Sequence, residues 1–474
     1  MAKAKEDKLQ TAKTYIGRAA ASKFPMVFCI VFAFVVVSGD LMQAFDWLDC
    51  RHSDILFRRR GMVEADSKIK ILEIDDASID YVGQYPWPRS VYKKLLDKLF
   101  KEGISVIALD VLFIDPSRPE EDRELIDVTR RHADQIVHAV ATDNKILNQM
   151  EFIYPFPGLR KVAKNIGQVA QPIKDNDGSF RYEPLVIGMA PRMRSYEWGK
   201  DPQAMPTLGL AALALHEKKD FRSYLALPGL SNESTTARLN FSGEQEKIMG
   251  VETLPDGSTE DIVSRRYGIE RIPAWRVLKG ELDPAQRARL KGAIVFLGST
   301  SQGAFDHFPS PFTGIEPGVI VHATLADNLM RNRHITEGSP LLPVLLIPLT
   351  ILAAYLLVRL SPLWSGLSFV AILFGMLGVH EALFLRLYWV PIAGPLLAFF
   401  GAFLVLIVHR TVEENRKAAE VRGMFGQYVP PEVVDILVKN PERLKLGGDK
   451  RDMTIFFLDI AHFTTISEKM TPEA

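Results

Sequence analysis

The sequence predicts an α/β domain with parallel strands, preceded by one apolar helix and followed by three. Two observations support this prediction. In the middle of the 474-residue chain, short apolar runs rich in β-branched residues alternate with segments of helical apolar spacing. Long uncharged stretches lie on both sides of that region. A further apolar run close to residue 474 predicts the beginning of another domain.

The composition is that of a membrane protein with a large polar part. Hydrophobic residues make up 47% of the chain and charged residues 24%, so the apolar residues must be concentrated in segments. Lys plus Arg equal Asp plus Glu at 57 each, which gives no indication of a nucleic-acid partner. The two cysteines, Cys29 and Cys50, exclude a disulfide framework.

The N-terminal segment is basic and is followed by an apolar run. Six Lys or Arg residues lie before Pro25 against two acidic residues, so the positive-inside rule places this segment in the cytoplasm. The run from Pro25 to Ser38 is short enough for a removable signal peptide, which is the alternative. Because no clear Ala-x-Ala site follows, we expect an uncleaved anchor, and an exported segment in either case.

Three further apolar blocks lie downstream, at Leu341–Val358, Leu363–Val379 and Trp389–Val408. None contains a charge, and each has close to the roughly 20 residues that cross a bilayer. The second and third are separated by a predicted loop that contains His380 and Glu381. A buried soluble helix bundle is the alternative, but four crossings fit better and place both termini in the cytoplasm.

The exported region predicts a parallel sheet. Ile69 to Ile74 and Val106 to Val111 read as strands, and the helical spacing of Ser90 to Lys101 between them predicts a right-handed crossover. Ala293 to Leu297 predicts a further strand, and Gly318 to Met330 a helix. Thr207 to His216 predicts one more helix.

Polar residues follow three of these strands. Asp76, Asp110 and the Ser299-Thr300 turn come at or after the strand ends, and ligands of open parallel sheets bind outside the carboxyl ends. We therefore expect a pocket there. The alternative is that the carboxylates cap helices or bind loop amides.

The C-terminal stretch has the pattern of a strand, a carboxylate and a helix start. Thr454 to Leu458 reads as a buried strand, Asp459 follows it, and Thr465 to Glu468 has capping-box spacing. A carboxylate beside a helix N-terminus suits a divalent cation with a nucleoside triphosphate. The alternative is an Asp that only caps the turn.

This stretch resembles the first strand and helix of class III adenylate/guanylate cyclases, in the residues FFLDIAHFT and the lead-in FGQYVPP to LGG. The resemblance covers about the last fifty residues and implies an α+β catalytic domain that converts ATP or GTP to a cyclic nucleotide with two Mg²⁺ or Mn²⁺ ions. It implies that Asp459 and the carbonyl of Ile460 bind metal. Amides near Phe463 and Thr464 would hold the phosphates, and the sites would form in a homodimer.

The exported region resembles the type-two CHASE sensor domain. The stretches that carry the resemblance share short polar and aromatic motifs: RHSDILFRRRG from Arg51, YPWPR from Tyr85, ALDVLF from Ala108, DGSFR from Asp177 and EPG from Glu316. This family joins an extracytoplasmic sensor to three membrane helices and a cytoplasmic output. The resemblance implies a multi-pass protein of the inner (plasma) membrane with a periplasmic sensor for an unknown signal.

Together these observations predict the following order: a cytoplasmic N-terminus (1–24), a first membrane helix (25–45), the sensor (46–339), three membrane helices (340–409), connecting helices (410–449) and the start of the cyclase domain (450–474). The last part is shorter than an ordinary domain, so we expect a longer protein and no cyclase activity from these 474 residues alone. A sensor without chemistry that acts through a partner, and an exported enzyme using Asp76 and Asp110, are the alternatives.

Overall fold

The computed structural model describes residues 23–146, 149–169, 173–175, 177–187, 205–227, 236–253, 259–301, 303, 307–425, 454–459 and 461. The chain divides into two units, residues 1–406 and 407–474. The first contains the α/β domain and most of the apolar helices, and each unit is described by itself.

A seven-stranded sheet forms the centre of the α/β domain, with the order β13-β1-β14-β2-β3-β4 and β5 paired to β3. Its strands are β1 (Ile69–Ile74), β2 (Val106–Leu109), β3 (Ile136–Ile146), β4 (Gln149–Ile153), β5 (Asn165–Gln168), β13 (Glu270–Pro273) and β14 (Ile294–Ser299). All pairs in it are parallel except β3 with β4. The parallel strands predicted from the sequence are confirmed.

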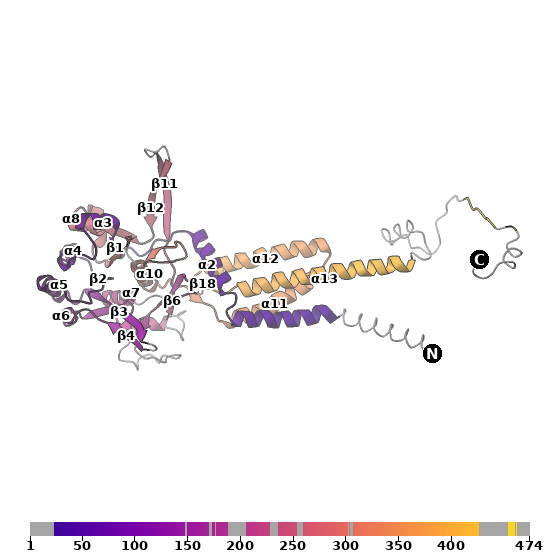
Figure 1. The fold of residues 1–474 in the computed structure, drawn as a ribbon, viewed down its shortest axis with the longest axis horizontal. Coiled ribbons are helices and arrows are strands. Elements are labelled where there is room, and N and C mark those ends of the chain that lie inside the picture. Colours follow the sequence, from indigo (N-terminus) through magenta and orange to yellow (C-terminus); the bar gives the residue numbers. More distant parts are fainter. Residues whose placement is uncertain are drawn as a thin grey trace. The chain divides into compact units, whose positions relative to one another are not determined.

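Helices cover both faces of the sheet (Figure 1). They are α3 (Asp76–Val82), α4 (Arg89–Lys101), α5 (Pro119–Arg131), α6 (Pro157–Arg160), α7 (Leu208–Glu217), α8 (Ala274–Lys279), α9 (Pro284–Leu290) and α10 (Gly318–Met330). Alternate residues of β1 enter two separate cores: Ile71 packs with residues of α7 and α10, and Leu72 with residues of α4 and α5. This alternation makes the domain a three-layer sandwich.

Shorter pairs of strands surround the main sheet. One small sheet has three strands: β6 (Ile173–Lys174), β7 (Phe180–Pro184) and β10 (Thr236–Arg238). The two-stranded sheets are β8 (Val186–Ile187) with β9 (Met205–Pro206), β11 (Glu244–Thr253) with β12 (Thr259–Tyr267), and β15 (His307–Phe308) with β16 (Glu316–Pro317). A short 3-10 helix, η1 (Phe221–Ala226), follows α7. In Figure 1 the hairpin β11–β12 projects from the domain.

Four apolar helices belong to the predicted membrane part. They are Lys23–Leu41, α11 (Leu341–Leu357), α12 (Pro362–Leu385) and α13 (Ala393–Phe425). Three of them are long and apolar enough to cross a membrane; α11 has 17 residues, at the lower end of the spanning range. The sequence placed His380 and Glu381 in a loop, but α12 continues through both because its apolar residues extend to Leu385.

Two junction elements connect the domain to these helices. The helix α2 (Asp46–Arg60) follows the first apolar helix, and β17 (Thr336–Glu337) pairs in parallel with β18 (Tyr388–Trp389), which lies between α12 and α13. Both elements tie the domain to the ends of α12 and α13.

The second unit contains the polar end of α13, which reaches Phe425, so the segment predicted to connect from residue 410 begins as a helix. Residues 454–459 have no regular secondary structure, and their side chains are exposed, so the strand predicted at Thr454–Leu458 is not formed. A strand needs a neighbour to satisfy its backbone groups. The helix start predicted at Thr465 lies outside the described residues.

Candidate functional site at the base of the domain

The crevice residues predicted from the sequence do lie at one edge of the sheet. Because β14 lies between β1 and β2 and all three are parallel, their carboxyl ends are adjacent. Asp76 is the exposed first residue of α3, and the amide of Asp110 donates to Leu297 O at 2.8 Å. Their use as ligands of a small molecule stays a prediction.

The hydroxyl groups at this edge hold the strand ends together. Ser299 Oγ donates to Ile74 O at 3.4 Å, and Thr300 Oγ1 lies 3.3 Å from Glu73 Oε2. Asp75, rather than Asp76, caps α3 by accepting a hydrogen bond from Ser78 N at 2.9 Å. Two cavities of the domain, of about 20 and 670 Å³, have linings that include none of the four predicted residues.

A dense polar arrangement lies at α2, the helix between the domain and the apolar helices (Figure 1). Its exposed residues are Trp47, Arg51, Ile55, Arg58 and Arg59, and its buried residues include Asp49, Ser53 and Asp54. Acidic residues occupy its first turn, at Asp46 and Asp49, and Arg58 to Arg60 its last turn. Negative charge at the N-terminus and positive charge at the C-terminus interact favourably with the helix dipole, which stabilises α2.

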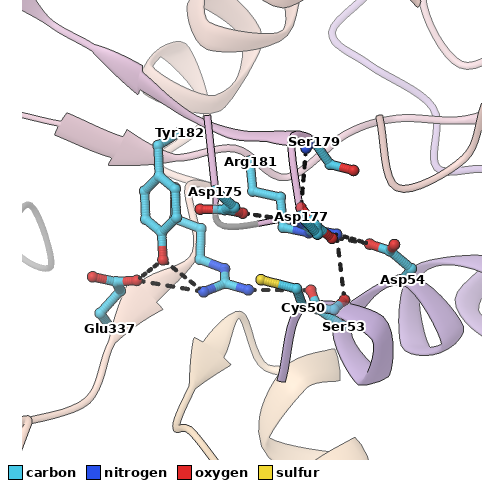
Figure 2. A network of polar contacts seen from close by, with 10 residues as sticks. Cys50, Ser53, Asp54, Asp175, Asp177, Ser179, Arg181, Tyr182 and Glu337 are labelled. Carbon is cyan, nitrogen blue, oxygen red and sulfur yellow. Dashed lines mark hydrogen bonds and ion pairs between the residues drawn. The ribbon is translucent and has the colours of Figure 1, made fainter. Parts of the chain in front are cut away.

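Toward the domain, α2 is held by a buried arginine on β7. The side chain of Arg181 is 0% exposed, and Figure 2 shows it among three carboxylates. Its Nη2 donates to Asp54 Oδ1 of α2 at 2.7 Å, and its Nη1 donates to Asp175 Oδ2 at 2.7 Å. The carboxylate of Asp177 accepts hydrogen bonds from both of these nitrogens, from Nη1 at 3.0 Å and from Nη2 at 2.9 Å. One cation therefore joins α2 to the loop before β7.

The ionisation of this network follows from burial and from Arg181. Burial raises the pKa of Asp54 and Asp175, and the bonds to Arg181 oppose that effect. For Asp177, burial also acts upward, but the bonds to Arg181 and to the amide of Ser179 outweigh it and lower the pKa. The three carboxylates raise the pKa of Arg181 against the effect of burial, so the arginine stays charged.

The atoms of Cys50, Asp175 and Asp177 lie within 4.8 Å of one another, as ligands of a metal ion would. Both carboxylates, however, already bind Arg181. Burial also raises the pKa of the Cys50 thiol to about 12, which disfavours the thiolate that metals bind. The chemistry of this donor set therefore fits an ion-pair network better than a metal centre.

A second arginine, Arg238 of β10, extends the network toward the apolar helices. It donates to Ser53 Oγ of α2 at 3.1 Å and to the hydroxyl of Tyr182 at 2.8 Å. Its guanidinium also lies 4.1 Å from the ring centre of Trp389 on β18. Arg238 thus contacts the domain, α2 and the α12–α13 connection at once.

Toward the apolar helices, α2 binds both α12 and α13. Asp49 Oδ1 accepts hydrogen bonds from the amides of Ile392 and Ala393, at 2.8 and 3.0 Å, where α13 begins. His52 Nε2 lies 3.0 Å from Nδ1 of His380 on α12. Burial raises the pKa of Asp49 to about 6, although the two amides act in the opposite direction. The helix α2 therefore contacts the domain on one side and the ends of α12 and α13 on the other.

The residues predicted to bind metal and nucleotide lie elsewhere, in the second unit. Asp459 is exposed and has no regular secondary structure. Ile460, Phe463 and Thr464 lie outside the described residues. Their proposed roles stay predictions.

These observations define a class of protein: an α/β domain tied by a buried polar junction to helices that can cross a membrane, which is the arrangement of a membrane receptor. The family model of the CHASE2 domain matches residues 27–362, more than half of the chain. The chain belongs to the CHASE2 domain family, and it is a signal-sensing membrane receptor. No curated protein and no solved structure matches it.

The α2 junction was not predicted from the sequence as a site, although the sequence contains a signal for it. Asp54 lies in the stretch RHSDILFRRRG and Arg181 in DGSFR, two of the motifs that carry the resemblance to the family. Their side chains form an ion pair between residues 127 positions apart. The sequence contains both partners, but local patterns do not pair them.

Proposed function

We propose that this receptor controls a class III nucleotidyl cyclase, which converts ATP or GTP to the 3′,5′-cyclic monophosphate and pyrophosphate. The single observation that carries the proposal is the stretch FFLDIAHFT around Asp459, with its lead-in, at the cytoplasmic end of the predicted topology. The signal would act on the domain from outside the membrane, and the catalytic sites would form in a homodimer.

Coupling between the two ends would pass through α2 and α13. The helix α13 begins at the amides that Asp49 binds and continues to Phe425 without a break. Its polar part has an ion pair from Arg410 to Glu414 at 2.7 Å, four residues apart, which supports a straight helix in water. A helix of this kind transmits a rotation or shift of its N-terminus along its length.

Asp459 and the carbonyl of Ile460 would supply hard oxygen ligands to Mg²⁺ or Mn²⁺, and the amides near Phe463 and Thr464 would hold phosphate oxygens. When bound, two such ions would activate the ribose 3′-hydroxyl and neutralise the leaving pyrophosphate. An exposed carboxylate such as Asp459 fits one ligand position. A single carboxylate does not complete the set, so we expect residues 1–474 alone to be inactive.

The test compares this chain with an extended chain, in which the remainder of a class III cyclase catalytic domain follows residue 474. In lipid nanodiscs with Mn²⁺ and ATP or GTP, we expect the extended chain to form cyclic nucleotide and the 474-residue chain to form none. Asp459→Asn should remove the activity of the extended chain, whereas Glu124→Gln on the exposed face of α5 should not. An extended chain that is inactive with both nucleotides would favour the alternative, a sensor that acts through a separate partner.

A further inference from the structure

The outward face of α2 has an unusual composition. Trp47, Arg51, Ile55 and Arg58 follow one another at intervals of four, four and three residues, so they form one stripe, which Arg59 widens. All five are exposed, with Trp47 at 55% and Ile55 at 52%. We call these five residues the α2 stripe.

The acidic residues of α2 all lie away from the stripe. Asp49 and Asp54 are buried and bound to α13 and to Arg181, and Asp46 is half-buried. The α2 stripe carries only positive charge.

The basic groups of the stripe are weakly held. Arg58 donates to Pro311 O at 3.3 Å, and Arg59 lies 3.2 Å from Glu381 with 64% of its side chain exposed. Arg51 makes no ion pair within the described part of the chain. The stripe therefore has cationic groups that can bind an anionic partner.

The position of α2 indicates which partner this is. The helix starts four residues after the apolar helix Lys23–Leu41, and its His52 and Arg59 contact the end of α12. In Figure 1 it lies between the domain and the ends of the apolar helices. Tryptophan and arginine beside apolar residues are typical of the membrane–water interface, where the ring sits among headgroups and the guanidinium binds phosphate.

We propose that the α2 stripe lies on the membrane surface and binds the headgroups of anionic phospholipids. A second copy of the chain is the other candidate partner, but a two-fold interface would place the arginines of one stripe against those of the other. The negative charge of anionic lipid headgroups instead complements the positive charge of all three arginines of the stripe. Since the remaining faces of α2 bind Arg181 and the start of α13, the lipid surface holds the helix that connects the domain to the membrane part. This inference does not depend on the proposed cyclase activity.

The test uses the full chain in nanodiscs of phosphatidylcholine, with and without phosphatidylglycerol. A spin label is placed at Ile55→Cys after Cys29 and Cys50 are replaced by serine, and a reference label at the exposed Glu124→Cys of α5. We expect phosphatidylglycerol to shield the label at position 55 from a water-soluble nickel complex and to expose it to oxygen. The label at position 124 should not change.

Charge variants identify the contact. Arg51→Gln should raise the phosphatidylglycerol content needed for half-maximal shielding by about fivefold, the effect expected for one basic residue at an anionic surface. Lys94→Gln, which removes an exposed charge from α4, should leave it unchanged. As a label-free check, brominated lipids should quench Trp47, seen as a difference between the chain and Trp47→Phe.

Two outcomes would overturn the proposal. One is a label at position 55 that stays as open to the nickel complex as the label at position 124 in both lipids, without quenching of Trp47. The other is dipolar broadening between labels at position 55, which would show that a second copy covers the stripe.

Discussion

Replacement of Arg181 by methionine tests the polar junction directly. The substitution keeps most of the side-chain volume but leaves Asp54, Asp175 and Asp177 without their common cation. Removing one partner of a buried ion pair costs about 3–5 kcal/mol, because the remaining charges stay desolvated. We expect Arg181→Met to lower the free energy of unfolding of the domain by roughly that amount.

The assay is thermal unfolding of the full chain in nanodiscs, followed by intrinsic fluorescence. A loss of this size lowers Tm by roughly 6–15 °C in a domain of this size. The matched control is Arg222→Met: Arg222 is half exposed and pairs with an exposed Asp220 at 3.1 Å, so its loss should change Tm by no more than about 2 °C.

The pH dependence separates an electrostatic loss from a packing defect. Burial already raises the pKa of Asp54 and Asp175, and without Arg181 only the charges of Arg58, near Asp54, and Arg238, near Asp175, oppose that effect. In the variant these carboxyl groups bind protons more tightly in the folded state than in the unfolded state, so its stability rises as the pH falls. The difference in stability from the unmodified chain should therefore shrink as the pH falls. A Tm within 2 °C of the control, or a deficit that does not vary with pH, would refute the reasoning.

Three further predictions concern other parts of the chain. Burial raises the pKa of Asp49 in the folded state from 3.8 to about 6, so the charged carboxylate destabilises the folded chain at higher pH. The substitution Asp49→Asn keeps the acceptor oxygen without the charge, and it should stabilise the chain by up to roughly 3 kcal/mol at pH 8 but not below about pH 4. Thermal unfolding at both pH values measures this difference. A cysteine placed just beyond Arg422 should resist an impermeant maleimide added outside intact cells, and labelling there would contradict the predicted topology. Asp76→Asn should leave Tm within about 1 °C, because Asp76 is exposed and surface changes are usually small. If a small molecule binds this edge of the sheet, its stabilising effect should be lost in both Asp76→Asn and Asp110→Asn.

Local sequence patterns predicted the elements of the domain well and their neighbours less well. The strand at Ile69–Ile74 and the helix at Gly318–Met330 have the predicted bounds, because each is encoded by its own apolar spacing. The insertion of β14 between β1 and β2 was not predicted, since it joins segments more than two hundred residues apart. Pairing of distant segments depends on the whole sheet and leaves no local pattern.

The candidate site follows the same rule. The crevice residues were brought to one edge as expected, because parallel strands end together. The junction at α2 was not predicted, because the stretch RHSDILFRRRG does not show which of its charged residues are buried. Asp54 is buried and Arg58 is exposed, and only their partners in the fold distinguish them. At the other end of the chain, Thr454–Leu458 has the composition of a strand but no partner strand in the described residues.

The short pair of β17 with β18 has a mechanical consequence. The amide of Thr336 donates to Leu387 O and that of Gly338 to Trp389 O, each at 2.8 Å. The segment that leaves the domain is therefore hydrogen-bonded to the connection between α12 and α13. By its order in the chain, α11 would be the first helix to receive a force from the domain. The β17–β18 pair bypasses α11 and transfers that force directly to the N-terminus of α13.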